Sequence, residues 1–178
     1  MFFFKSNEDN SITVLAVYVD DIILLTNTDE EMTQLKHSLS VRFKMKDLGS
    51  LHYILGIHVE QREHTIRLHQ QYFVESLLNK FGMGDCKPVS TPITELLEKN
   101  DGFSKSVDPK EYQSMVGSLL YLAIATRPDI SFAVGVASKF SSCPNESHLT
   151  AVKRIMGYLK GTIDLGLLYS ASLEPHCV

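Results

Sequence analysis

The chain has 178 residues, of which 44% are hydrophobic, so it can bury a core as one domain or as two small ones. No apolar run reaches the ~18 residues that a membrane span needs. Three widely spaced cysteines argue against a disulfide framework or a zinc motif and favour an intracellular protein. The net charge of -4 excludes a uniformly basic nucleic-acid binder. Residues 1–35 are strongly acidic and residues 136–162 are basic, which fits either separate metal and phosphate contacts or two solvated faces.

Two β-branched and aromatic runs near the N-terminus predict a β-hairpin with two carboxylates at its tip. Residues 2–5 are a short strand candidate, and residues 13–19 and 22–26 have the composition of buried strands. The two-residue gap between the longer runs is typical of a tight turn and holds Asp20 and Asp21. Two carboxylates about 4 Å apart repel by roughly 4 kcal/mol at an effective dielectric near 20, and a divalent cation such as Mg²⁺ offsets that cost. On the dipeptide alone, a solvated turn is an equally good interpretation.

The next segments predict a helix and a second hairpin. Thr28 and Glu31 have the spacing of a capping box, and an apolar stripe follows that predicts a helix packed on the sheet. The stripe consists of Met32, Leu35, Leu39 and Phe43. A strand over residues 53–59 returns through residues 65–68. Three histidines near this hairpin match no metal-ligand spacing, so we expect them at the surface. They are His58, His64 and His69.

Apolar residues recur at helical spacing over four segments in the second half of the chain. These segments are residues 70–81, 112–125, 130–140 and 147–159. Gly82 ends the first segment, and Pro128 suits the first turn of the third. A short strand is predicted over residues 165–169.

Two further features of this half bear on organisation and binding. Residues 84–110 are rich in proline and charge, which predicts an exposed linker between a β-rich half and a helical half. In the last helix, three basic side chains lie off the apolar stripe and are candidates for phosphate contact. They are Lys153, Arg154 and Lys160.

Several short motifs occur in the order found in one known family. They are YVDD at 18–21, FKMKDLG at 43–49, LGI at 55–57, KFGM at 80–83, CKPVSTP at 86–92, VGSLLYL at 116–122, TRPDI at 126–130 and YLKGT at 158–162. On these motifs the chain resembles the reverse transcriptase region of the Pol polyprotein of copia-type long-terminal-repeat retrotransposons. The resemblance covers residues 12–169, and the motifs taken together are highly specific.

The resemblance implies an α+β fold: a partial reverse-transcriptase palm of antiparallel hairpins and a helix, followed by a helical thumb and connection region. Residues 1–83 would hold the partial palm, a primer-grip-like hairpin and the first thumb helix. Residues 84–110 would be a linker, residues 111–169 the helical thumb and connection, and residues 170–178 an unstructured tail.

The resemblance also implies a catalytic role for the hairpin tip. Asp20 and Asp21 match the family's metal-binding pair, which holds two Mg²⁺ ions for nucleotidyl transfer, with Mn²⁺ as a substitute. Asp20 would be the main ligand, and Asp21 would bind more peripherally. We expect the chain alone to be inactive, because the family's further palm carboxylate and its fingers would precede Met1.

Nucleic-acid contacts follow from the same resemblance. Tyr18 and Val19 would lie against the primer end, although a buried strand aromatic is an equal interpretation for Tyr18. Leu55 and Gly56 fall where the primer would be held. The implied partners are an RNA template, a DNA primer, deoxynucleoside triphosphates and the remainder of the Pol polyprotein, with no membrane.

The implied location is the cytoplasm, within the parent element's virus-like particle, or the nucleus. Two alternatives to a polymerase stay open. One is a catalytically inactive remnant that binds nucleic acid through the basic helix. The other is a non-functional product of a decayed element. Primer extension on an RNA template is the experiment that separates these possibilities most directly.

Overall fold

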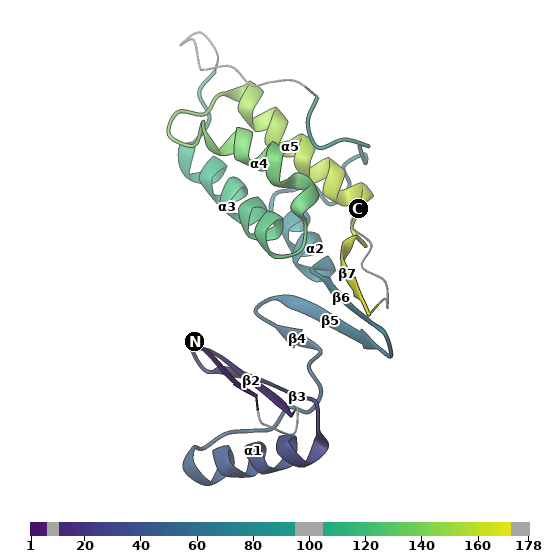
Figure 1. Ribbon diagram of the computed structural model, residues 1–178. Coiled ribbons are helices and arrows are strands. Elements are labelled where there is room, and N and C mark those ends of the chain that lie inside the picture. Colours follow the sequence, from purple (N-terminus) through teal and green to yellow (C-terminus); the bar gives the residue numbers. More distant parts are fainter. Residues whose placement is uncertain (7–10, 95–104, 172–178) are drawn as a thin grey trace. The chain divides into compact units, whose positions relative to one another are not determined.

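The computed structural model describes residues 1–6, 11–94 and 105–171, and their fold is α+β as predicted (Figure 1). The chain divides into two compact units, Met1–Leu51 and His52–Val178. Each unit builds its own antiparallel sheet from its own strands. None of the helices in the described ranges combines the length and apolar character that a bilayer crossing requires.

The first unit is a three-stranded antiparallel sheet with one helix. Strands β1 (Phe2–Ser6), β2 (Ile12–Tyr18) and β3 (Asp21–Thr26) pair in chain order, which confirms the predicted hairpin. Helix α1 (Asp29–Arg42) follows, and acidic side chains in its first turn favour the positive end of the helix dipole.

The N-terminus of α1 differs from its prediction. Thr28 is the N-cap residue, but its hydroxyl makes no hydrogen bond. The Glu31 carboxylate instead accepts hydrogen bonds from the hydroxyls of Ser11 at 2.8 Å and Thr13 at 3.0 Å. The predicted capping box is therefore wrong, because Glu31 ties the helix to the sheet. Its contact with Thr13 places α1 on the face of β2 that carries this side chain.

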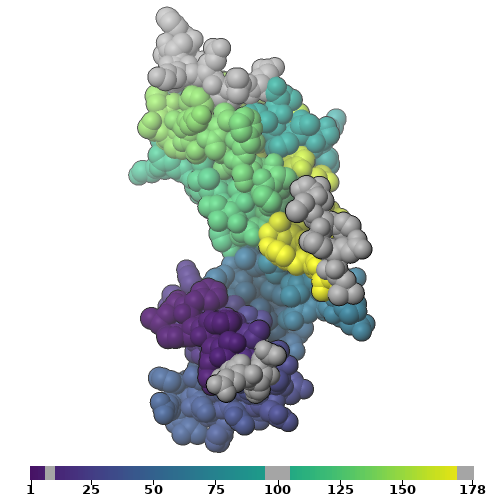
Figure 2. All heavy atoms as spheres, viewed as in Figure 1, coloured from purple at the N-terminus to yellow at the C-terminus, as the bar shows by residue number. Residues whose placement is uncertain are grey.

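Much apolar surface of the first unit is uncovered. The predicted stripe of α1 is half-buried at Met32, Leu35 and Leu39, and Phe43 is exposed. Phe2 and Phe4 of β1 are 80% and 70% exposed, and the purple atoms of this strand lie at the surface in Figure 2. Among the described residues of this unit, no apolar side chain is fully buried. A single helix is too small to cover a three-stranded sheet, so these two layers do not enclose a core.

A side-chain-stabilised turn follows α1. The Gly49 N–H donates a hydrogen bond to the Asp47 carboxylate at 2.9 Å, and Lys36 forms an ion pair with it at 3.0 Å. The backbone hydrogen bond, followed by the bond to Lys36, lowers the pKa of Asp47. Gly49 adopts a φ of +77°, which glycine reaches without strain. This turn gives a local structural reason for the DLG sequence at 47–49.

The second unit contains a four-stranded antiparallel sheet in the order β4-β5-β6-β7. The strands are β4 (Tyr53–Ile54), β5 (Ile57–Arg62), β6 (Thr65–His69) and β7 (Gly166–Ser170). The predicted strand over 53–59 is interrupted by a turn at Leu55 and Gly56. The predicted strand over 165–169 is confirmed as β7, which pairs with β6. A Cβ at Gly166 would collide with the Leu68 carbonyl, so this pairing requires glycine.

Helices form the core of the second unit. They are α2 (Gln71–Lys80), α3 (Pro109–Ala125), the short 3-10 helix η1 (Pro128–Ile130), α4 (Ser131–Ser138) and α5 (Glu146–Gly161). Gly82, at a φ of +65°, ends α2, and the Met83 N–H bonds the Leu78 carbonyl at 2.7 Å, as in a Schellman motif. The helices bury one apolar cluster, in which the largest fully enclosed side chains include Tyr112, Leu119, Leu122, Ile130, Met156 and Leu159.

The segment before residue 95 lies against α5. The Val89 N–H donates to the Gly157 carbonyl at 3.3 Å, and Gly157 and Gly161 leave room for residues 87–89. A Cβ at Gly161 would come within 3.1 Å of the Pro88 Cβ. The start of the predicted linker over 84–110 thus lies against α5, and residues 95–104 lie outside the described residues. The division into two compact units falls after Leu51. Gly157 and Gly161 carry no side chain on this face of α5, so residues 87–89 can approach the helix closely.

Candidate functional site

The carboxylates of Asp20 and Asp21 lie at the tip of the β2–β3 hairpin. Val19 and Asp20 form the two-residue turn, and Asp21 is the first residue of β3, opposite Tyr18. The sequence predicted both aspartates in the turn, so the pairing is displaced by one residue from that prediction. Tyr18 is 59% exposed, which rules out the interpretation as a buried strand aromatic. All four side chains of the tip are accessible to a ligand.

The backbone of Val19 is strained. Its φ is +51°, a region that β-branched residues rarely enter because the Cβ approaches the following carbonyl oxygen. A hairpin turn that needs a positive φ at its first central position usually carries glycine there. The Val19 side chain is 81% exposed, so it makes no compensating core contact. Backbone strain of this kind clusters at functional sites, where the side chain is needed for something other than stability.

The donor set at the tip suits a hard divalent cation. Mg²⁺ is commonly held by one or two carboxylates, with its other positions filled by water and substrate phosphates. Asp20 and Asp21 match that donor set. Within the described ranges, no group of three or more His, Cys, Asp or Glu side chains could hold a metal ion. A pair of carboxylates leaves most coordination positions to water and to a bound substrate.

A second tight turn lies between β4 and β5. Leu55 and Gly56, which the sequence assigned to primer contact, are its two central residues, with φ values of +49° and +76°. The Tyr121 hydroxyl donates a hydrogen bond to the Leu55 carbonyl, and the Gln70 side-chain amide donates to the Gly56 carbonyl at 3.3 Å. Positive φ at both central residues is the pattern of type I′ hairpin turns. The sequence missed this turn because the apolar run through Leu55 continues on both sides of it.

The three basic residues of α5 lie in different environments. Lys153 is exposed, whereas Lys160 is half-buried and lines a hollow with Glu75 and Asn79. The Arg154 guanidinium donates to the Thr91 hydroxyl at 2.9 Å, which draws this side chain toward the segment that follows α2. Lys153 and Lys160 are seven residues apart and therefore share one helix face.

The histidines of the second unit depart in part from their prediction. His64 is exposed as expected, but His69 is only 6% exposed, so the surface prediction was wrong for it. Its ring stacks on His58 at 5.2 Å, and its Nε2 lies 3.2 Å from a Glu60 oxygen. Burial, together with the nearby charge of Arg67, lowers the pKa of His69 despite the Glu60 carboxylate. His69 is therefore neutral at physiological pH.

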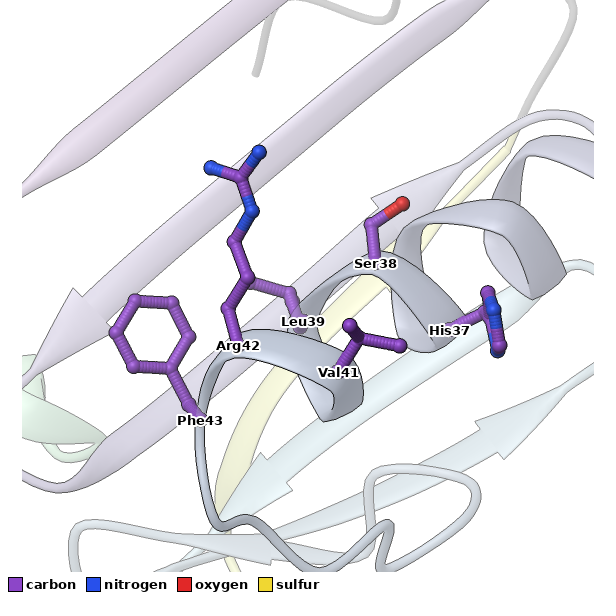
Figure 3. A pocket seen from close by; sticks show the side chains of 6 residues that line it. All are labelled: His37, Ser38, Leu39, Val41, Arg42 and Phe43. Atoms are coloured by element: carbon purple, nitrogen blue, oxygen red, sulfur yellow. The ribbon is translucent and has the colours of Figure 1, made fainter.

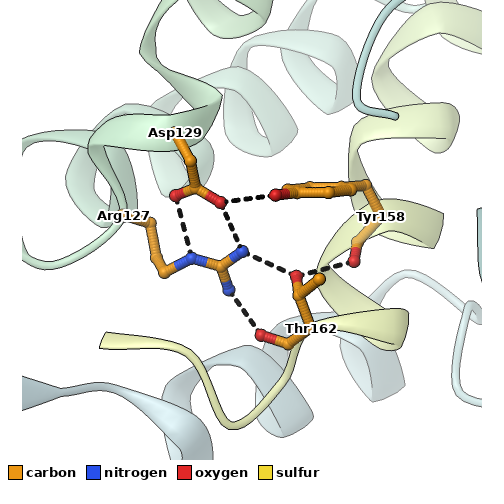
Figure 4. A network of polar contacts seen from close by, with 4 residues as sticks. All are labelled: Arg127, Asp129, Tyr158 and Thr162. Atoms are coloured by element: carbon orange, nitrogen blue, oxygen red, sulfur yellow. Dashed lines mark hydrogen bonds and ion pairs between the residues drawn. The ribbon is translucent and has the colours of Figure 1, made fainter. Parts of the chain in front are cut away.

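A buried ion-pair network joins the TRPDI and YLKGT motifs (Figure 4). The Arg127 guanidinium, only 2% exposed, donates to both Asp129 oxygens at 3.0 and 2.8 Å and to the Thr162 carbonyl and hydroxyl at 2.8 and 2.6 Å. The Tyr158 hydroxyl donates to Asp129 at 2.8 Å. Burial disfavours the charged carboxylate, but hydrogen bonds from Arg127 and Tyr158 outweigh it and lower the pKa of Asp129.

This network satisfies its own members and holds the end of α3 against the end of α5. The sequence analysis used both motifs for the family resemblance and did not predict their contact. The sequence signal that could have pointed to this network is an arginine next to Pro128, at the start of a predicted helix. If such an arginine is buried, its charge requires a carboxylate partner.

A hollow of the first unit lies at the C-terminal end of α1 (Figure 3). It is lined by His37, Ser38, Leu39, Val41, Arg42 and Phe43. All of these residues come from the last turns of α1 and the residue after it, so the hollow is a surface depression on one element. None of the candidate catalytic, metal-binding or nucleic-acid-binding residues from the sequence analysis lines this hollow.

Comparisons with known proteins identify relatives of the chain. Residues 1–95 match the family model described as reverse transcriptase (RNA-dependent DNA polymerase). An uncharacterized mitochondrial protein of Arabidopsis thaliana is 41% identical over 86% of this chain and 63% of its own length. The retrovirus-related Pol polyprotein from transposon TNT 1-94 of Nicotiana tabacum is 38% identical over 96% of this chain. The corresponding polyprotein from transposon RE1 of Arabidopsis thaliana is 42% identical over 92% of it.

The chain spans only part of these relatives. It covers 14% of the tobacco polyprotein and 11% of the Arabidopsis polyprotein. No solved structure matches the chain.

Proposed function

The chain belongs to the reverse transcriptase family, in its branch of copia-type retrotransposon Pol polyproteins, and on this basis we propose that it carries the catalytic hairpin, the primer-holding turn and the helical thumb and connection region of an RNA-directed DNA polymerase. Its substrates are then a DNA primer on an RNA template and deoxynucleoside triphosphates. The first unit corresponds to part of the palm, and the remainder of the Pol polyprotein is a partner.

One observation carries this proposal beyond the family match. The strained Val19 stands next to two exposed carboxylates on a hairpin tip. A turn selected only for stability would carry glycine or asparagine at that position. An exposed, rigid valine beside Asp20 instead suits contact with the sugar or base at a primer end, with Tyr18 as its neighbour on β2.

The chain's own residues have distinct roles in this reaction. Asp20 and Asp21 would hold divalent ions at the tip, and Val19 and Tyr18 would orient the primer end. The primer 3′-oxygen would attack the α-phosphorus of the nucleotide, its proton would pass to water, and the bond to the pyrophosphate oxygen would break. Bound Mg²⁺ or Mn²⁺ would supply activation of the 3′-hydroxyl and charge stabilisation on the leaving pyrophosphate.

Divalent metal binding tests the assignment of the tip. We expect weak Mn²⁺ binding that broadens the NMR signals of residues 18–22 and is lost in Asp20→Asn. Asp29→Asn is the matched control, because it removes one exposed carboxylate from the first turn of α1 in the same unit. Equal broadening of the tip in wild type and Asp20→Asn would place the metal elsewhere.

Primer extension tests the catalytic competence of the 178 residues. Two exposed carboxylates on a turn hold metal loosely, and a misplacement of about 1 Å can cost ~10²-fold in rate. We therefore expect no extension of an oligo-dT primer on poly-rA by the chain alone. Extension that Asp20→Asn abolishes would show that these residues suffice for catalysis.

A second candidate function is nucleic-acid binding without catalysis, through the face of α5 that carries Lys153 and Lys160. Such binding is electrostatic and indifferent to sequence, so log affinity falls as log salt rises. Replacing both lysines by alanine should reduce that slope by about 1.5. Arg154→Ala should change the slope less, because Arg154 is half-buried and its guanidinium is drawn toward the Thr91 hydroxyl. An unchanged slope in the double variant would remove α5 from the interface.

A further inference from the structure

The Leu55–Gly56 turn is held by two helices that are distant from it in sequence. In an isolated hairpin, the carbonyls of such a turn face water. Here Tyr121 of α3 binds the Leu55 carbonyl, and Gln70, which precedes α2, binds the Gly56 carbonyl. The backbone conformation of the turn is therefore fixed from outside the hairpin.

Both anchoring side chains are themselves fixed. Gln70 is 2% exposed, and its amide oxygen accepts a hydrogen bond from the buried Thr126 hydroxyl at 2.9 Å. The Tyr121 ring packs edge-on against Phe73 of α2, with 5.0 Å between ring centroids. Each turn carbonyl is thus connected to the helical core through one intermediate side chain.

The space around Gly56 is closed by the same tyrosine. A Cβ at Gly56 would lie 2.6 Å from the Tyr121 hydroxyl oxygen, and the φ of +76° disfavours any other residue there. Leu55, in contrast, is 43% exposed although its φ is +49°. The anchors therefore hold a strained leucine outward, where a ligand can reach it.

We propose that Tyr121 and Gln70 are positioning residues that hold the Leu55–Gly56 turn in the conformation that contacts the 3′ end of a primer. This inference rests on the proposed function, because it takes the turn as the primer-holding element. It adds a specific route by which the helical core sets the geometry of that contact. In this role, neither residue needs to touch the primer itself.

The test measures selectivity for a primer end with the full chain. The probe is a DNA–RNA duplex with a recessed DNA 3′ end, compared with a duplex of equal length whose 3′ end is closed by a loop. We expect the wild type to prefer the recessed end, and Tyr121→Phe to lose about fivefold of that preference, the value of one hydrogen bond. Affinity for the closed duplex and the thermal midpoint should stay near wild type, since the Phe73 contact is kept.

A second measurement reports on the turn directly. Amide hydrogen exchange at Gly56 and Ile57 should accelerate in Tyr121→Phe and in Gln70→Met. Tyr169→Phe is the control, because Tyr169 is an exposed tyrosine on β7 in the same unit. It should change neither exchange nor selectivity. Gly56→Ala should reduce selectivity, and adding Tyr121→Phe should not reduce it further by the full fivefold, because the two changes disturb one contact.

The outcomes separate this inference from the function on which it rests. If the wild type prefers the recessed 3′ end and Tyr121→Phe keeps that preference, the positioning role is overturned. This holds whether or not amide exchange at Gly56 and Ile57 accelerates. A wild type without selectivity for the recessed end overturns primer holding by this turn, and the positioning role with it. Loss of selectivity together with faster exchange, confined to Tyr121→Phe and Gln70→Met, supports the inference.

Discussion

At the scale of single residues, the backbone strain of Val19 lowers the stability of the β2–β3 hairpin. A β-branched residue at a φ of +51° costs about 1–2 kcal/mol relative to a residue that tolerates this region. Asparagine tolerates it and adds no flexibility of the kind that glycine would bring to the unfolded chain. Val19→Asn should therefore stabilise the β2–β3 hairpin by about 1 kcal/mol, measured as slower amide exchange at Tyr18 and Asp21, the pair that closes the turn.

The matched control is Val17→Asn, two residues earlier in β2. Val17 is half-buried, and its φ is not positive, so the same change removes apolar contact without relieving strain. We expect faster exchange in that variant. If Val19→Asn also accelerates exchange, the strain argument for the tip fails, and the turn is an ordinary structural one.

At the scale of elements, the Arg127 network should make the docking of α3 on α5 depend on pH. The folded-state pKa of Asp129 is lowered, so its carboxylate stabilises the fold above the unfolded value of about 3.9, and this contribution is lost as pH falls through the folded pKa. Asp129→Asn should lower the free energy of unfolding in urea at pH 7 by about 1.5–3 kcal/mol, the range for hydrogen bonds to charged groups. The difference from wild type should shrink on acidification below about pH 4.

Glu146→Gln is the control for that experiment. Glu146 pairs with Lys105 at 3.4 Å, but both side chains are largely exposed, so the pair contributes about 0–1 kcal/mol. A pH-independent deficit in Asp129→Asn would mean that the hydrogen bonds, and not the charge, hold the two helix ends together.

The sequence was informative about elements wherever the signal is local. The periodic apolar residues, Pro128 and Gly82 marked helices and their ends close to where they lie. It was uninformative about contacts between distant residues, such as Gln70 with Thr126, because a single sequence holds no pattern that relates positions 56 apart. The position of the hairpin tip was predictable to within one residue, because a turn of two residues between apolar runs is itself local. The anchoring of the Leu55–Gly56 turn was not.

At the scale of the whole molecule, the two compact units predict where a protease cuts. Residues 41–50 are all exposed, and they include Lys44 and Lys46 shortly before the division after Leu51. Lys87 also has an exposed side chain, but its backbone lies against α5, where the Val89 N–H bonds the Gly157 carbonyl. A protease needs several residues in extended, detached form, so cleavage within residues 85–91 requires local opening.

Limited subtilisin digestion should therefore cut within residues 43–50 before it cuts within residues 85–91, as followed by mass spectrometry of the intact products. A protease of broad specificity is needed because trypsin does not cleave the Lys87–Pro88 bond. Gly161→Leu tests the reason, because a side chain at this position would push Pro88 off the helix. In that variant, cleavage within residues 85–91 should become as fast as cleavage within residues 43–50. If wild type is cut first within residues 85–91, the segment before residue 95 is detached in solution, and the sequence-based linker over 84–110 describes the chain better than a division after Leu51.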